Sequence, residues 1–248
     1  MTTSPLAGKT ALVTGAGKRL GKAIALELAR AGANIVVHVN SSMADGEATL
    51  AEVRALGVRA ALVRADQRKP QEIEAACRAA QEALGPVMYL VNSAANWPHV
   101  DLENTTPEDF DLAVETNLRG PFFWARYLGP EIKRAGGGAI VSIADVTMDR
   151  PLVDSIPYTL AKAGIVTMTY ALAKALAPEV RVNAIGPGPI LLPENYHATA
   201  AGKDVAATLL KRLGAPKDIA GTVRFLLESD YITGAFLPVD GGFRFGAE

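Results

Sequence analysis

The alternation of short apolar runs with stretches of helical periodicity limits this chain to very few architectures. Seven runs that contain β-branched residues are typical of strands, and they lie at residues 10–14, 34–39, 59–65, 87–93, 138–144, 180–185 and 235–240. Between most of them, apolar residues recur at helical spacing and predict helices at about 18–31, 43–56, 70–84, 107–134, 158–176 and 216–227. This pattern predicts an α/β fold: a doubly wound parallel sheet of about seven strands with helices on both faces.

Length and composition fit one soluble domain. No Ser/Pro-rich linker and no run of charges divides the 248 residues, so we expect a single domain over 1–248. The net charge of -1 offers no electrostatic basis for binding nucleic acid or an anionic membrane, and a small molecule is the expected ligand. Residues 1–9 lack an apolar signal core, and no apolar stretch approaches the roughly 20 residues of a membrane span. The sequence therefore predicts a cytoplasmic protein.

Cysteine and histidine are too sparse for a metal site. Cys77 is the sole cysteine, which excludes an internal disulfide. The three histidines are scattered and show no ligand spacing. We therefore expect no catalytic metal.

The segment TGAGKRLG, residues 14–21, lies between the first predicted strand and the first predicted helix. Such a junction attracts a phosphate, because free backbone N–H groups and the helix dipole meet there. Gly15, Gly17 and Gly21 read G-x-G-x-x-x-G, one residue longer than the usual dinucleotide fingerprint. Lys18 and Arg19 oppose the dipole unless an anion lies beside them. They are interpreted as phosphate ligands, with a solvated surface pair as the alternative.

The residues after the second and third strands bear on the choice of cofactor. A site for NAD places Asp or Glu after the second strand to hold the ribose 2′-hydroxyl, whereas this chain has Asn40, Ser41 and Ser42. With Arg19 in possible reach of a 2′-phosphate, the cofactor is predicted to be NADPH/NADP+. The alternative is that residues 40–42 only cap the next helix. Asp66 either accepts a hydrogen bond from an adenine amine or caps a turn.

Tyr158 and Lys162 form a Y-x-x-x-K pair in the helix that follows the fifth strand. Pro157 suits the first turn of a helix, and the two side chains are one turn apart on the same face. A free Tyr has a pKa of about 10, and a nearby cation together with the helix dipole favours its phenolate. The pair therefore predicts a Tyr that transfers a proton at neutral pH.

Over essentially its whole length, the chain resembles the short-chain dehydrogenase/reductase family. The glycine turn at 14–21, the Tyr158/Lys162 pair, Asn117 in ETNLRGPFF and the turn in NAIGPGPI match the family's motifs in order. The resemblance implies a Rossmann-type NAD(P)-binding domain in which Tyr158 is the general acid. It also implies that Lys162 lowers the pKa of Tyr158 and holds the nicotinamide ribose, and that Asn117 holds a proton-relay water. Asn92 matches the first residue of the family's N-N-A-G motif, from which Ser93 and Ala95 depart.

Two departures resemble the pteridine reductase branch of the family. Asp145 stands thirteen residues before Tyr158, where the family has Ser, and Arg19 replaces the middle glycine. The branch then implies that Trp97 stacks on a pterin. A charged Asp145 would raise the pKa of Tyr158, whereas a protonated one could donate to a ring nitrogen. The alternatives are an idle Asp145 paired with Arg150 or Lys162, and a Trp97 that is an ordinary core or lid aromatic.

The predicted site combines these motifs with the family's pattern. Its catalytic residues are Asn117, Asp145, Tyr158 and Lys162, and its substrate residues are Trp97, Asp145 and Tyr158. Its cofactor residues are Gly15, Lys18, Arg19, Leu20, Asn40, Ser41, Ser42, Asp66, Gln67, Asn92, Ala94, Tyr158, Lys162, Pro187, Gly188 and Ile190.

The expected function is NADPH-dependent hydride transfer to a pteridine-like C=N bond or to a carbonyl. A 3-oxoacyl or sugar carbonyl reductase is the alternative enzyme. A non-catalytic NADP-binding sensor is the alternative of another class, and it would require a degraded active site. The resemblance also implies a homotetramer and a substrate lid at about 190–213.

Overall fold

A single parallel sheet organises the molecule. The computed structural model describes residues 4–191 and 198–246. Seven strands pair in the order β3-β2-β1-β4-β5-β6-β7, all in parallel. They are β1 (Thr10–Val13), β2 (Asn34–Val39), β3 (Ala60–Arg64), β4 (Val87–Asn92), β5 (Gly138–Ile143), β6 (Val180–Pro187) and β7 (Phe236–Val239). The predicted doubly wound sheet of about seven strands is confirmed.

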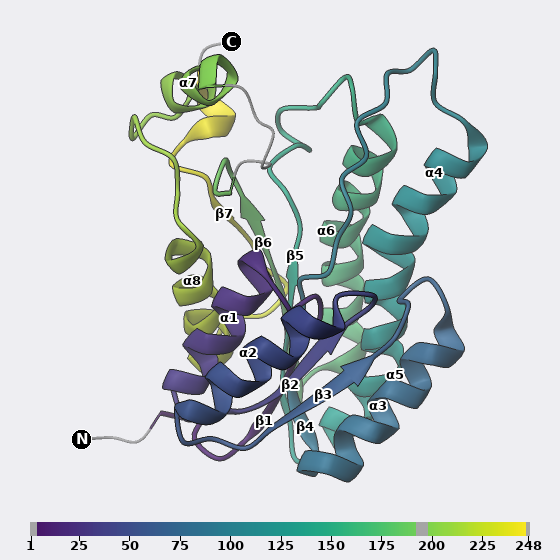
Figure 1. Ribbon diagram of the computed structural model, residues 1–248, viewed down its shortest axis with the longest axis vertical. Coiled ribbons are helices and arrows are strands. Elements are labelled where there is room, and N and C mark those ends of the chain that lie inside the picture. Colours follow the sequence, from purple (N-terminus) through teal and green to yellow (C-terminus); the bar gives the residue numbers. More distant parts are fainter. Residues whose placement is uncertain (1–3, 192–197, 247–248) are drawn as a thin grey trace.

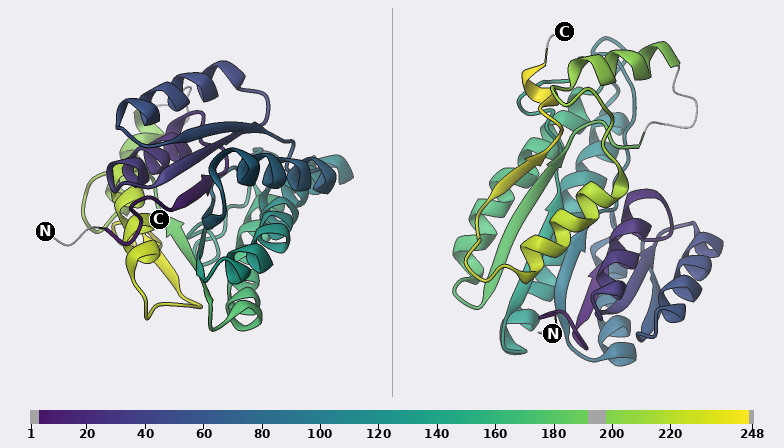
Figure 2. Two further views of the ribbon diagram at one scale, coloured as in Figure 1. Left: turned by 90° about the horizontal axis from the view of Figure 1, so that it is seen from below. Right: turned by 90° about the vertical axis from the view of Figure 1, so that its left-hand side faces the viewer.

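Helices cover both faces of this sheet (Figures 1 and 2). The α-helices are α1 (Arg19–Arg30), α2 (Met43–Ala55), α3 (Pro70–Leu84), α4 (Pro107–Val114), α5 (Gly120–Arg134), α6 (Ile156–Leu176), α7 (Ala198–Ala207) and α8 (Pro216–Glu228). A π-helical segment, η1 (Glu115–Arg119), joins α4 to α5, and a short 3-10 helix, η2 (Phe243–Phe245), lies near the C-terminus. Within the described residues, no helix is long and apolar enough to cross a membrane.

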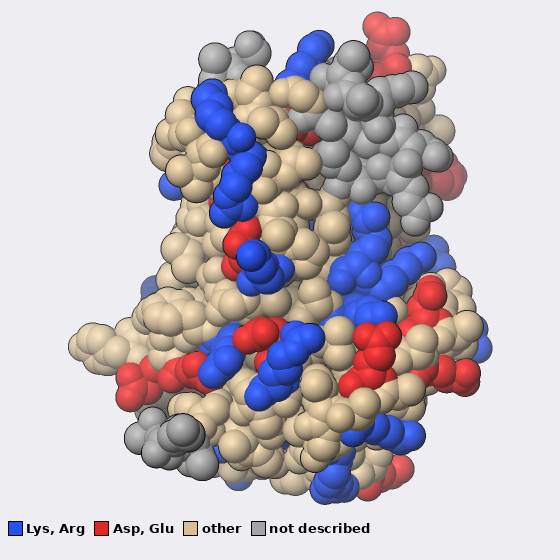
Figure 3. Space-filling view, turned by 60° about the vertical axis from the view of Figure 1, so that its left-hand side comes forward, with Lys and Arg blue, Asp and Glu red and all other residues tan. Residues whose placement is uncertain are grey.

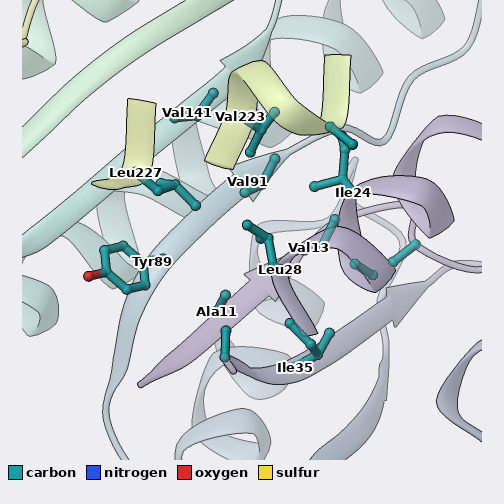
Figure 4. Packing of buried hydrophobic residues seen from close by; sticks show 14 of the residues in the cluster. Ala11, Val13, Ile24, Leu28, Ile35, Tyr89, Val91, Val141, Val223 and Leu227 are labelled. Carbon is teal, nitrogen blue, oxygen red and sulfur yellow. The ribbon is translucent and has the colours of Figure 1, made fainter. Parts of the chain in front are cut away.

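The first core layer lies between the sheet and the helices α1, α2 and α8. Figure 4 shows Ile24 and Leu28 of α1 meeting Val223 and Leu227 of α8 above the strands. All four side chains are essentially fully buried. Burial of one such side chain contributes roughly 1.5–3 kcal/mol, so this layer anchors α1 and the turn that precedes it.

The second core layer lies on the opposite face, under α3, α5 and α6. Trp124, Leu128 and Ile132 recur along α5 at helical spacing and are completely buried against the sheet. Together the two layers account for the apolar runs of the strands, which are covered on both sides.

The helix predicted over 107–134 is continuous but contains the π-segment η1. Pro121 explains the irregularity, because it has no N–H for the carbonyl four residues earlier and its ring collides with that carbonyl. The carbonyl in question belongs to Asn117, inside η1. The backbone therefore widens at the residue that the sequence marks as functional.

The sheet order also locates the ligand site. The chain leaves β1 toward β2 on one side, and β4 pairs with β1 on the other. This reversal makes a crevice beyond the carboxyl ends of β1 and β4, where open α/β sheets bind ligands. Around this framework, basic and acidic side chains are interspersed on the face shown in Figure 3.

Candidate active site

A cavity of about 860 Å³ opens above the carboxyl ends of the strands. Most of the predicted site residues line it, and they come from the segments that follow six different strands. They are Gly15, Lys18, Arg19, Leu20, Asn40, Ser41, Ser42, Asp66, Gln67, Ala94, Trp97, Asp145, Tyr158, Lys162, Pro187, Gly188 and Ile190. Two predicted residues, Asn92 and Asn117, are buried behind the wall instead. Within the described residues, no cluster of His, Cys, Asp and Glu could hold a metal ion.

The glycine turn closes tightly at the base of the cavity. Gly15 has φ +65°, and a Cβ there would lie 2.8 Å from the Cα of Ala94. A Cβ on Gly21 would overlap the carbonyl oxygen of Gly15. Glycine is required at both positions because the turn packs directly against the start of α1 and the loop after β4.

Arg19 has the left-handed φ of +51°, which is unusual for a residue with a side chain. Its Nη2 donates to the carbonyl of Leu191, 3.0 Å away. Leu191 follows β6, whereas Asn40 and the two serines follow β2. The structure therefore directs the Arg19 guanidinium toward the segment after β6.

His38, near the end of β2, supports the glycine turn and was missed by sequence reasoning. Its Nδ1 accepts from the backbone N–H of Gly15 at 3.2 Å, and its Nε2 lies 3.0 Å from the carbonyl of Ala65. These partners fit a neutral ring with its proton on Nε2. Complete burial lowers the pKa of His38 to about 4. The available signal was a polar residue within the apolar run of residues 35–39.

The segment after β2 carries no carboxylate. Ser42 is the N-cap residue of α2, but its side chain makes no capping hydrogen bond. The capping alternative therefore does not explain this serine.

Asp66 and Gln67, after β3, have partners within the protein. Both carboxylate oxygens of Asp66 accept from the Arg68 side chain, and Oδ1 also accepts from the Arg68 backbone N–H. These bonds cap the turn and lower the pKa of the carboxyl. Gln67 Nε2 donates to the carbonyls of Ala94 and Thr116. Both residues thus brace the cavity wall.

The phenol of Tyr158 forms a hydrogen bond with the Asp145 carboxylate. Its Oη donates to Oδ2 of Asp145 at 2.6 Å, which excludes an Asp145 paired only with Arg150 or Lys162. Lys162 Nζ donates to the carbonyl of Ile143 at 2.7 Å and lies 5.6 Å from the centre of the Tyr158 ring. Three of the four predicted catalytic side chains, Asp145, Tyr158 and Lys162, therefore lie together at the end of β5.

Burial dominates the protonation of this group. The pKa of Tyr158 lies well above its ordinary value, because the phenol is buried and the Asp145 carboxylate is its neighbour. Burial also raises the pKa of Asp145 and lowers that of Lys162 to about 8. Lys162 is not among the causes of the raised phenol pKa, because its ammonium contacts the Ile143 carbonyl whereas Asp145 contacts the hydroxyl. That Lys162 lowers the phenol pKa stays a prediction.

Trp97 lies beside the phenol at the open side of the cavity. Its ring centre is 5.9 Å from that of Tyr158 and 4.3 Å from that of His99. The indole Nε1 donates to Oγ of Ser155 at 3.2 Å, and 41% of the residue is exposed. Trp97 is therefore a wall of the cavity and not a core residue.

Asn92 and Asn117 are held by neighbouring side chains. Asn92 Nδ2 donates to Ser142 Oγ at 3.1 Å, across β4 and β5. Asn117 Nδ2 donates to Asn96 Oδ1 at 2.6 Å and to the carbonyl of Ala113 at 2.9 Å. The amide NH2 group of each asparagine thus forms hydrogen bonds within the protein, behind the cavity wall. Their positions in the sequence did not indicate this.

His99, Asp154 and Phe243 are among the further wall residues that sequence reasoning missed. Phe243 comes from η2, and Arg150 lies over its ring at 4.4 Å. His99 lies in the loop after β4, Asp154 in the loop after β5 and Phe243 in η2. No local sequence motif includes all three.

A glycine turn at the switch point of a doubly wound sheet, facing a buried Tyr and Lys across one cavity, defines a nicotinamide-dependent oxidoreductase. Residues 15–244 match the family profile described as enoyl-(acyl carrier protein) reductase. The chain belongs to the short-chain dehydrogenase/reductase family.

Proteins of different described activity are similar to this chain over nearly their whole length. The 3-oxoacyl-acyl-carrier-protein reductase FabG of Staphylococcus epidermidis is 33% identical over 239 residues, 94% of this chain and 98% of that protein. The L-rhamnose 1-dehydrogenase (NAD(P)(+)) of a Sphingomonas species is 34% identical over 245 residues, 96% of each chain. The FolM alternative dihydrofolate reductase 1 of Brucella canis, solved with NADP, is 30% identical with a TM-score of 0.92, covering 98% of this chain and 96% of that one.

Proposed function

We propose that this enzyme uses NADPH to reduce the C=N bond of a planar, pteridine-like heterocycle, or a carbonyl, with Tyr158 as the proton donor. One observation carries the proposal: the Tyr158–Asp145 hydrogen bond lies beside the exposed indole of Trp97. The indole offers a planar substrate a stacking surface. The acidic pair offers a proton at the atom to be reduced.

The cavity residues fit NADPH. The glycine turn supplies backbone N–H groups for phosphates, and Lys18 adds a positive charge at its rim. Asn40, Ser41 and Ser42 offer a 2′-phosphate polar groups and no repelling carboxylate. The structurally similar Brucella canis reductase, solved with NADP, adds support.

The protein's part in the reaction is to hold and transfer a proton. When bound, NADPH supplies a hydride. Tyr158 keeps its proton at neutral pH because its pKa is raised, and it donates that proton to the substrate nitrogen or oxygen that replaces Asp145 as acceptor. Lys162 then stabilises the phenolate electrostatically from beside the ring. Asp145, whose own pKa is raised by burial, supports an adjacent ring nitrogen by a second hydrogen bond.

A 3-oxoacyl or sugar carbonyl reductase is the second candidate, favoured by the FabG and rhamnose dehydrogenase relatives. Tyr158 would serve that chemistry equally, and Trp97 would then only border the pocket. A non-catalytic NADP sensor has less support, because Tyr158, Asp145 and Lys162 lie together at the cavity.

The deciding experiment follows the loss of NADPH absorbance with dihydrobiopterin, a 3-oxoacyl thioester and a sugar lactone or ketose in parallel. Preferential turnover of the pterin supports the first candidate. Turnover of only the thioester or sugar supports the second. No turnover of any of them, with NADPH bound, supports the sensor.

The cofactor assignment has its own test. Asn40→Asp places a carboxylate where it repels a 2′-phosphate and accepts from a 2′-hydroxyl. We expect NADPH affinity to fall at least about tenfold relative to NADH, as one lost charge-assisted contact implies. Arg19→Ala, measured beside it, reports whether that guanidinium serves the 2′-phosphate or only the Leu191 segment. An unaltered NADPH/NADH ratio in Asn40→Asp would contradict the proposed cofactor site.

We further infer a cytoplasmic homotetramer with a lid over the substrate at about 190–213. Residues 192–197 of that segment lie outside the described residues, and α7 forms much of the rest. Phe122 on α5 and Leu160 and Tyr170 on α6 are 43–53% exposed, which supports burial of this surface between subunits.

A further inference from the structure

The loop that carries Trp97 is joined to the π-segment by a pair of asparagines. Asn117 Nδ2 donates to the side-chain Oδ1 of Asn96 at 2.6 Å, and the backbone N–H of Asn96 donates back to Asn117 Oδ1 at 3.2 Å. Asn117 is 1% exposed, and its Nδ2 also donates to the carbonyl of Ala113. The buried side-chain amide of Asn117 therefore holds Asn96 at two atoms, its side-chain Oδ1 and its backbone N.

Asn96 directly precedes Trp97. Residues 93–99 belong to no helix or strand, so their conformation depends on such side-chain contacts. On the other side of the loop, Trp97 Nε1 donates to Ser155 Oγ, whose single proton faces two carbonyls, that of Asp154 at 2.6 Å and that of Pro98 at 3.1 Å. Holding a loop residue in one conformation costs backbone entropy. The two anchors offset that cost on either side of the indole.

We propose that Asn96 is a positioning residue: by accepting from Asn117, its side chain fixes the Trp97 indole beside Tyr158 and thereby selects planar substrates. Its side-chain bond is separable from the rest of the pair, because the Asn96 backbone N–H and the Ala113 carbonyl hold Asn117 without it. The effect on substrate choice rests on the proposed function. The effect on Trp97 does not.

Two variants of similar size isolate the acceptor. Asn96→Leu removes it, whereas Asn96→Asp retains an oxygen for Asn117 Nδ2. We expect Asn96→Leu to raise KM for dihydrobiopterin about tenfold, the loss expected for one hydrogen bond. The KM for a 3-oxoacyl thioester and both kcat values should change less than about threefold, because Tyr158 and Asp145 are untouched. Asn96→Asp should restore the pterin KM.

Tryptophan fluorescence gives a readout that needs no substrate. Trp97 is 41% exposed and Trp124, the other tryptophan, is 0% exposed, so acrylamide quenches chiefly Trp97. Trp97→Phe identifies that component as a control. Asn96→Leu should increase its quenching constant, and Asn96→Asp should not. Thermal unfolding of each variant checks folding, with Asn96→Ala as a milder truncation if the leucine variant fails to fold.

Three outcomes overturn the proposal. In the first, Asn96→Leu matches the parent in both pterin KM and quenching. In the second, Asn96→Asp and Asn96→Leu lose kcat equally on all substrates while quenching stays constant, so the pair serves Asn117 and not Trp97. In the third, quenching stays constant and no substrate is turned over. If instead quenching changes as expected but no variant or parent reduces any substrate, the positioning of Trp97 stands and the proposed function fails.

Discussion

At the scale of single residues, the proposed active site is centred on a buried phenol and a buried carboxyl that share one hydrogen bond. Tyr158 and Asp145 are both buried, and burial raises the pKa of each. A raised phenol pKa suits the reductive direction, because the donor must be protonated before the reaction. The same pair is less suited to abstracting a proton from an alcohol.

Tyr158→Phe tests this assignment. The ring remains but the proton is lost, so we expect kcat to fall roughly 10²–10⁴-fold, the usual contribution of a general acid. NADPH affinity by fluorescence titration should change less than about threefold. Tyr231→Phe, at an almost fully exposed position, is the control. Retention of most activity in Tyr158→Phe would refute the role.

His38 makes stability depend on pH. Its pKa is lowered from 6.5 to about 4 by burial, so between these values the unfolded chain binds a proton that the native protein does not. Stability must therefore fall as the pH falls through this window, by about 3 kcal/mol for this residue. In His38→Asn the amide oxygen can still accept from the Gly15 N–H. The part of the stability that His38 loses at low pH should be retained in this variant.

Urea unfolding at pH 7 and pH 4.5 measures the difference. His99→Asn, at a half-exposed position, is the matched control and should retain the acid loss. An equal loss in the parent and in His38→Asn would show that other groups carry it.

At the scale of elements, two backbone irregularities shape the site. Pro121 widens the helix at η1, where Asn117 then holds Asn96. The glycine turn lets α1 begin directly against the Gly15 carbonyl. Helices α1 and α8 share the first core layer, so the turn is supported from behind.

Gly21→Ala tests the packing of the turn. The added Cβ overlaps the Gly15 carbonyl, so α1 must shift, and we expect a loss of about 1–3 kcal/mol with weaker NADPH binding. Gly221→Ala in α8 is the control, because its Cβ meets nothing within 4 Å. That variant should gain roughly 0.5–1 kcal/mol from helix propensity. Chemical denaturation and cofactor titration report both effects, and an unimpaired Gly21→Ala would contradict the close packing.

At the scale of the whole molecule, exposed apolar side chains on α5 and α6 favour a surface that another subunit covers. If the proposed homotetramer forms, light scattering should give four times the 26.0 kDa chain mass. Phe122→Glu places a charge in that surface and should reduce the particle mass measured by light scattering, because burying an unpaired charge is costly. Leu56→Glu, at the end of α2, is the control. A monomer mass for the parent protein would contradict the proposed assembly.

The sequence by itself determined the parallel sheet, its two helical layers and the family, because apolar periodicity and the glycine and Tyr-Lys spacings are local patterns. It also predicted Tyr158, Asp145 and Lys162 as one group, and the structure brings them together. Only the tertiary structure decided the direction of the Tyr158 pKa, the neutral state of His38 and the Asn96–Asn117 pair. Each of these depends on burial and on contacts between segments distant in the chain, which no spacing along a sequence records.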